Sequence, residues 1–81
     1  MARIIGDELF KINKSRNLIH QNVDCSFSTF FDNKGNKYFQ LDTYGSNIRE
    51  FKGKISQSLQ LDKETAKILI SILNEEFNIN S

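Results

Sequence analysis

Alternating apolar and polar positions mark two extended segments in the middle of the chain. Side chains alternate with a period of two over residues 23–31, and the same alternation returns over residues 37–44. This period is typical of strands that have one face on a core and the other in water. The intervening run "DNKGNK", residues 32–37, contains Asn and Gly, which adopt positive φ at little cost. It therefore predicts a hairpin turn between two antiparallel strands.

A third extended segment is predicted after a turn at residues 45–47. Residues 50–61 place the apolar Phe51, Ile55, Leu59 and Leu61 on one side of a strand. The other side is polar and consists of Lys52, Lys54, Ser56, Ser58 and Gln60. Residues 1–12 fit a short strand interrupted near Gly6, although a helical turn fits nearly as well. The pattern thus predicts an antiparallel sheet of about four strands.

The C-terminal part of the chain has the periodicity of an amphipathic helix. Asp62 is a suitable N-cap, and we expect the helix to run from about Lys63 to Phe77. An apolar stripe with i, i+3, i+4 spacing is expected to lie on the sheet: Ala66, Leu69, Ile70, Leu73 and Phe77. Ile68 and Ile72 lie one turn apart beside this stripe, and they form either a widened core face or a patch through which copies associate. The expected fold class is α+β, an antiparallel sheet of about four strands covered by one C-terminal helix.

The size of the chain adds an expectation of self-association. Its 81 residues contain no repeat or Gly/Ser-rich linker, so we expect one small α+β domain over residues 1–81. A single core of this size is marginal, and a homo-oligomer would supply further burial. No apolar run approaches the roughly 18 residues of a membrane span, and the first residues lack the apolar region of a signal peptide. We therefore expect a cytoplasmic protein without a membrane partner.

Candidate catalytic chemistry is sparse, and we expect a protein that is not an enzyme. His20 is the single histidine and Cys25 the single cysteine, with no second base to complete a nucleophilic arrangement. Cys25 is expected to be a buried or half-buried strand residue. The carboxylates are scattered and no His or Cys ligands cluster, so no catalytic residue, metal ion or cofactor is predicted. A net charge of +1 does not indicate a binder of duplex DNA.

The polar sides of the predicted strands would meet on one face of the sheet. That face would carry Tyr38, Gln40, Asp42 and Tyr44 beside Lys52, Lys54, Ser56, Ser58 and Gln60, with Arg49 at its edge. Bases stack on exposed tyrosines while Lys and Arg contact phosphates, as in proteins that bind single-stranded nucleic acid. A solvated sheet face is the simpler interpretation of any one of these residues. Their concentration on one face favours a ligand-binding surface.

The run "REFKGKISQSLQLDKETAKILISIL", residues 49–73, together with the order of several strands before one helix, carries a resemblance. It resembles the single-stranded-DNA-binding domain of the transcriptional coactivator positive cofactor four, over about the second half of the chain. The resemblance implies that Lys52 and Lys54 hold nucleic acid and that the helix at residues 63–77 takes part in a dimer contact. This chain is less basic than that family. The runs "FQLDTYGS" and "GKISQSLQLD" also resemble a set of small bacterial and phage proteins.

Three functions remain open at this level. The first is a non-enzymatic module that binds single-stranded DNA or RNA on the polar face of the sheet. The second is an oligomeric phage or bacterial protein that binds and sequesters a small nucleotide immune signal, since phosphate and base recognition use the same side chains. The third is a protein-interaction module or inhibitor that presents a sheet edge or the patch of Ile68 and Ile72.

Overall fold

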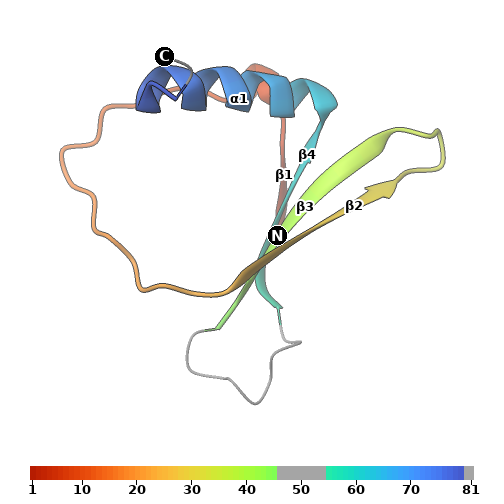
Figure 1. The fold of residues 1–81 in the computed structure, drawn as a ribbon, viewed down its shortest axis with the longest axis horizontal. Helices are drawn as coiled ribbons and strands as arrows, with labels where there is room; N and C mark the ends of the chain where they lie inside the picture. Colours follow the sequence, from red (N-terminus) through yellow and green to blue (C-terminus); the bar gives the residue numbers. More distant parts are fainter. Residues whose placement is uncertain (46–54, 80–81) are drawn as a thin grey trace.

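The computed structural model describes residues 1–45 and 55–79, which form one sheet and one long helix (Figure 1). Along the chain the elements are β1 (Ala2–Ile4), the short 3-10 helix η1 (Gly6–Glu8), β2 (Cys25–Phe31), β3 (Lys37–Tyr44), β4 (Ile55–Asp62) and α1 (Lys63–Phe77). The four strands have the order β1-β4-β3-β2. The predicted α+β class, the strand count and the C-terminal helix are confirmed. The start of the strand predicted over residues 50–61 lies outside the described residues.

One strand pair departs from the antiparallel arrangement. The pairs β2–β3 and β3–β4 are antiparallel, whereas β1 runs parallel to β4. Because β1 and β2 lie at opposite edges of the sheet, residues 9–24 must connect one edge to the other, and they do so in a wide arc (Figure 1). β1 and β2 also point in the same direction, so this connection must return to the end of the sheet at which both strands start. The sheet is therefore mixed.

The β2–β3 hairpin closes as its turn residues predict. The Oδ1 atom of Asp32 accepts hydrogen bonds from the backbone amides of Lys34 at 2.8 Å and Asn36 at 2.9 Å. Gly35 has a φ of 85°, a value that L side chains rarely adopt. These hydrogen bonds, chiefly that from the Asn36 amide, hold the pKa of Asp32 below its usual value of 3.8. The turn is thus held by one carboxylate and one glycine.

Asp62 is at once the last residue of β4 and the N-cap of α1. Its Oδ1 accepts from the Thr65 amide at 2.9 Å, which confirms the predicted cap. That hydrogen bond is the main reason why the pKa of Asp62 lies below 3.8, with smaller contributions from the Thr65 hydroxyl and the charge of Arg3. The helix ends at Asn78, which has left-handed φ and donates its amide to the Asn74 carbonyl.

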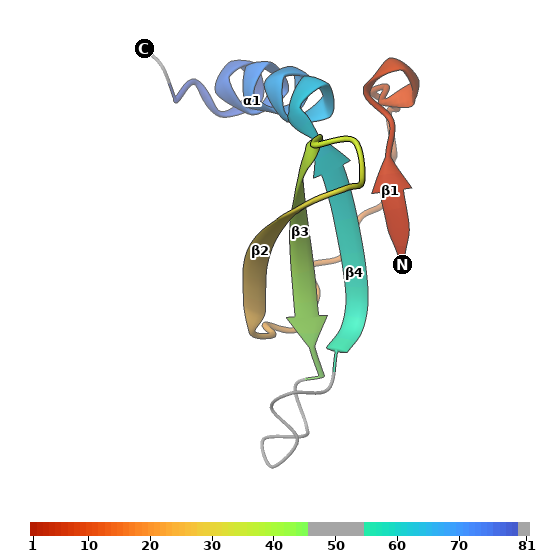
Figure 2. The same cartoon turned by 90° about the vertical axis from the view of Figure 1, so that its right-hand side faces the viewer.

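The first turn of α1 also holds the N-terminal segment. Thr65 is only 1% exposed, and its Oγ1 donates to the Ile4 carbonyl at 3.2 Å. Beside it, a Cβ on Gly6 would lie 2.7 Å from Ile68 Cδ1 and 3.4 Å from Thr65 Cα, so the absent side chain lets η1 approach the helix. Figure 2 shows β1 leading into η1 alongside α1. This contact fixes the edge strand β1 on β4.

The apolar stripe of α1 does not lie on the sheet as expected. Only the end of β4 and η1 pack closely with the helix, which runs across the end of the sheet (Figure 1). Ile70 is therefore 58% exposed and Phe77 70% exposed. The physical reason is that no residue separates β4 from α1, so the helix has no loop with which to fold back over the strands.

The apolar face of the sheet is also open. It carries Phe27 and Phe39, whose rings stack with centroids 5.4 Å apart, yet Phe27 is 70% exposed. Leu61, at 6% exposure, is the one fully buried apolar residue of the described chain. None of the described helices is both long enough and apolar enough to cross a lipid bilayer. The described chain thus buries very little of its apolar surface.

Thr65→Val is expected to lower the free energy of unfolding by about 1–2 kcal/mol, because it keeps the side-chain shape but leaves the Ile4 carbonyl without its donor. Urea denaturation followed by circular dichroism measures the change. Thr29→Val, the same substitution at an exposed position of β2, should stay within about 0.5 kcal/mol of the native protein. Equal stability of the two variants would show that the bond from the Thr65 hydroxyl to the Ile4 carbonyl does not stabilise the fold.

The cap at Asp62 should make stability depend on pH. Because its pKa in the folded protein lies below 3.8, the ionised cap stabilises the fold above pH 3.8 and loses this effect as the pH falls through the folded-state value. Asp62→Asn keeps a capping side chain that does not titrate. The melting temperature of the native protein should exceed that of Asp62→Asn at about pH 5, and the gap should close towards about pH 2.5. A difference in melting temperature that stays constant with pH would refute the role of ionised Asp62 as a stabilising cap.

Candidate ligand-binding face

The strand register gathers polar side chains on one side of the sheet. Gln40 lies opposite Gln60 and Asp42 opposite Ser58 on the β3–β4 pair, and β1 places Arg3 beside Gln60. Residues paired across strands point to the same side of a sheet. We call this side the polar face, and it consists of Arg3, Ser26, Ser28, Phe30, Tyr38, Gln40, Asp42, Tyr44, Ile55, Ser58 and Gln60.

A hydrogen-bonded chain of side chains runs along the middle of the polar face. Gln60 Nε2 donates to Gln40 Oε1 at 2.8 Å, and Gln40 Nε2 donates to Asp42 Oδ1 at 2.8 Å. Ser58 Oγ donates to the same Asp42 oxygen at 2.5 Å. Asp42 is only 7% exposed and Ser58 is buried as well. The centre of this face is therefore an ordered network rather than a set of independently solvated side chains.

Arg3 lies at one end of the network and is held by Tyr38. Its Nη1 donates to the Tyr38 hydroxyl at 3.1 Å, and its guanidinium carbon lies 5.7 Å from the centre of the Tyr38 ring. Tyr38 also stacks on Phe30 with centroids 5.5 Å apart, and its hydroxyl lies 3.4 Å from Asp32 Oδ2. Tyr38 thus orients the cation, and its ring already has neighbours in the unliganded chain.

A bulge alters the other end of the face. Thr43 pairs with Gln57 but Tyr44 pairs with Ile55, so Ser56 is the extra residue. Ile55 therefore shares the side of Tyr44, and the prediction that it lies with Leu59 and Leu61 on the apolar side is wrong. The alternation could not show the bulge, because one extra residue reverses every preceding side chain. The Tyr44 hydroxyl is 2.7 Å from Ser26 Oγ.

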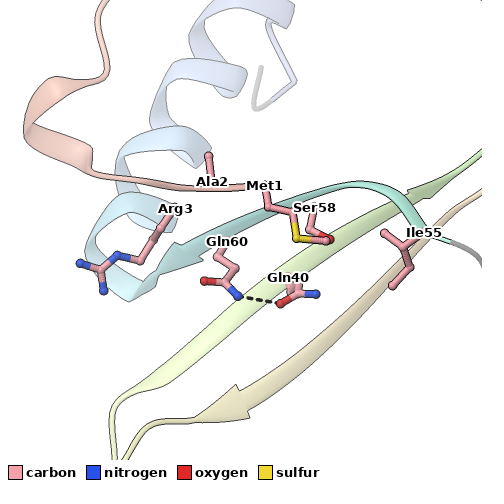
Figure 3. A pocket seen from close by; sticks show the side chains of 7 residues that line it. All are labelled: Met1, Ala2, Arg3, Gln40, Ile55, Ser58 and Gln60. Carbon is pink, nitrogen blue, oxygen red and sulfur yellow. Dashed lines mark hydrogen bonds between the residues drawn. The ribbon is translucent and has the colours of Figure 1, made fainter.

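A pocket opens on the polar face, with a volume of about 460 Å³. Its lining residues are Met1, Ala2, Arg3, Gln40, Ile55, Ser58 and Gln60 (Figure 3). Met1 and Ile55 supply apolar surface, and the amides and the guanidinium supply hydrogen-bonding groups. This combination suits a flat ring with polar edges, because ligand pockets join apolar walls to a few placed polar groups.

The predicted site residues fall into three groups. Tyr38, Gln40, Tyr44, Ser58 and Gln60 come together on the polar face, and Ser56 occupies the bulge. Arg49, Lys52 and Lys54 lie outside the described residues.

The two residues of the predicted association patch face the N-terminal segment of their own chain. Ile68 Cδ1 lies at Gly6, and Ile72 lines a second pocket with Leu9 and Phe10. Lys11 Nζ and Glu76 Oε2, 3.1 Å apart, hold the same segment against α1. These contacts are those of a widened core face for Ile68, while Ile72 keeps over a third of its surface exposed.

Sequence reasoning missed Arg3 and the burial of Asp42. Arg3 belongs to a strand of three residues whose partner could not be read from periodicity, so nothing in the pattern joined it to Gln60. Asp42 has the same alternation as Gln40 and Tyr44, which are only half-buried. Cys25 is exposed at the start of the edge strand β2, contrary to expectation, because no element of residues 1–45 and 55–79 covers the apolar side of the sheet there.

Comparison with known proteins adds no further constraint. No protein-family model, no curated protein and no solved structure matches this chain. The resemblance to positive cofactor four stays a hypothesis. Within residues 1–45 and 55–79, no three His, Cys, Asp or Glu side chains gather as a set of metal ligands.

Proposed function

We propose that the polar face binds single-stranded nucleic acid and that the protein catalyses no reaction. The observation that supports this is the pocket that Arg3, Gln40 and Gln60 line together with the apolar Met1 and Ile55. A nucleobase has flat apolar faces and polar edges, and its phosphate is a partner for guanidinium. The pocket offers a complementary group for each of these parts.

Three basic residues come shortly before the pocket residue Ile55 in the sequence. Lys54 immediately precedes the pocket residue Ile55, and Lys52 and Arg49 are a few residues before it. These three lie outside the described residues, so their part in binding stays a prediction. Cations are suited to the phosphates of nucleic acid, and the resemblance implies this role for Lys52 and Lys54.

A small nucleotide is the second candidate ligand. Its support is the size of the pocket, about 460 Å³, and its single described cation, Arg3. These suit one or two nucleotides rather than a long polymer. The cytoplasmic location expected from the sequence is compatible with either ligand and stays a prediction.

Titration with oligonucleotides of increasing length separates the two ligands. We expect affinity for single strands to rise with length and to fall as salt rises, whereas a nucleotide pocket would saturate with a mononucleotide or cyclic dinucleotide. Arg3→Gln should weaken binding by about tenfold or more, because it removes a charge-assisted contact. Arg16→Gln removes the same charge from the segment at residues 9–24 and should bind normally. Equal binding by both variants would contradict the proposed site.

We also propose that two copies of the chain associate through their apolar surfaces. The chain exposes 7551 Å², whereas a folded monomer of 9.4 kDa exposes about 5,000 Å². Its radius of gyration is 15.1 Å, against about 12 Å for a globular domain of this length. The excess of about 2,500 Å² lies at the upper end of the roughly 1,000–2,500 Å² that each partner buries in an obligate dimer.

A second copy is the partner that best fits this excess. A chain that buries so little apolar surface needs its partner in order to be stable, and another copy is present whenever the chain is made. The surface involved would include the exposed Phe27 and Phe31 of the sheet with Ile70, Leu73 and Phe77 of α1. A two-fold arrangement would use the same surface on both copies.

The native protein is expected to sediment above its chain mass of 9.4 kDa at about 20 μM. Ile70→Glu with Phe77→Glu should lower the sedimenting mass to that of one chain, because both positions are exposed in a single copy. Ser71→Glu introduces a charge at an exposed polar position of the same helix and should leave the mass unchanged. A native protein that sediments as a monomer would refute the association.

A further inference from the structure

The hydrogen bonds that link side chains along the polar face all donate towards Asp42, and the buried carboxylate of this residue sets their direction. The carboxylate of Asp42 accepts hydrogen bonds, so Gln40 must turn its Nε2 towards it. This places Gln40 Oε1 towards Gln60, which must then donate its own Nε2. Ser58 donates to Asp42 from the neighbouring strand and holds the carboxylate in place. Asp42 thereby determines the orientation of two amides in succession.

The consequence reaches the pocket at Gln60. Because Gln60 turns its Nε2 towards Gln40 and uses one of its two N–H groups there, its Oε1 is left as a hydrogen-bond acceptor at the pocket wall. Figure 3 shows this oxygen pointing away from Gln40, on the side where the guanidinium of Arg3 lies. No side chain of residues 1–45 or 55–79 donates to it. The wall therefore offers this acceptor on the side of Arg3.

We propose that Asp42 is a positioning residue that fixes the hydrogen-bonding polarity of the pocket. Acting through Gln40 and Gln60, it makes the pocket select a nucleobase edge that carries an N–H donor beside an acceptor. Adenine offers such an edge with its amino group and ring nitrogen, and the Watson–Crick edges of the other common bases also carry an N–H donor beside an acceptor. The pocket therefore accepts any of them and rejects analogues without the N–H donor. This inference rests on the proposed function.

A pair of oligonucleotides that differ only in the donor tests the inference. One consists of adenine nucleotides, and the other of nucleotides of unsubstituted purine, which lacks the 6-amino group but stacks similarly. The native protein is expected to bind the adenine strand at least about tenfold more tightly, because the purine leaves Gln60 Oε1 without a donor. Binding is measured by fluorescence anisotropy at fixed salt.

Asp42→Asn should abolish this selectivity. The new amide can donate as well as accept, so Gln40 and Gln60 are free to reverse and present either group to the ligand. The two strands should then bind within about twofold of each other. Asp7→Asn removes the same charge from the exposed helix η1 and should keep the tenfold preference. A preference that persists in folded Asp42→Asn overturns the inference.

A second variant decides the matter if Asp42→Asn fails to fold, which circular dichroism would reveal. Gln60→Leu keeps a side chain of similar size, leaves the bonds among Gln40, Asp42 and Ser58 in place and removes the acceptor. It should bind both strands equally, and retained preference overturns the inference. If the native protein binds both strands equally well, the inference fails while the proposed function stands. If it binds neither strand nor any nucleotide, both fail.

Discussion

The hydrogen bond from the Thr65 amide to Asp62 is the contact on which the rest of the fold depends. It stabilises the first turn of α1 directly after β4, with no residue between the two elements, and so directs the helix across the end of the sheet. The same turn buries Thr65, whose hydroxyl holds the Ile4 carbonyl and with it the edge strand β1. By holding β1, the turn between β4 and α1 also places Arg3 on the polar face. One capped turn thus connects the helix, the sheet and the candidate site.

The two faces of the sheet differ in whether their side chains find partners within one copy of the chain. On the polar face, burial of Asp42 is offset by hydrogen bonds from Gln40 and Ser58, which order the neighbouring side chains before any ligand arrives. Such order reduces the entropy lost on binding. On the other face Phe27 is exposed to solvent, and Ile70 and Phe77 of α1 are exposed at the end of the sheet, where the proposed association would cover them. Ligand binding and self-association would therefore use separate surfaces of the same small chain.

Local patterns predicted the elements well because each depends on residues close in sequence. The hairpin follows from Asp32, which accepts hydrogen bonds from the turn amides, and from Gly35, which adopts the positive φ that the turn needs. The helix and its cap follow from Asp62 and the spacing of the apolar residues after it. The opposition of Gln40 to Gln60 and of Asp42 to Ser58 also agrees with simple alternation, since both pairs lie on the regular side of the bulge.

The sequence by itself determined the strands of the hairpin, the capped helix and the polar character of one sheet face, because these depend on local periodicity and on side chains that bond their own backbone. Only the tertiary structure decided that Ile55 joins the polar face, since a bulge changes register without changing composition. It also decided that β1 runs parallel to β4 and delivers Arg3, which requires a contact between opposite ends of the chain. The exposure of the helix stripe was decided in the same way, because the direction of α1 depends on the geometry of a single turn that no periodicity encodes.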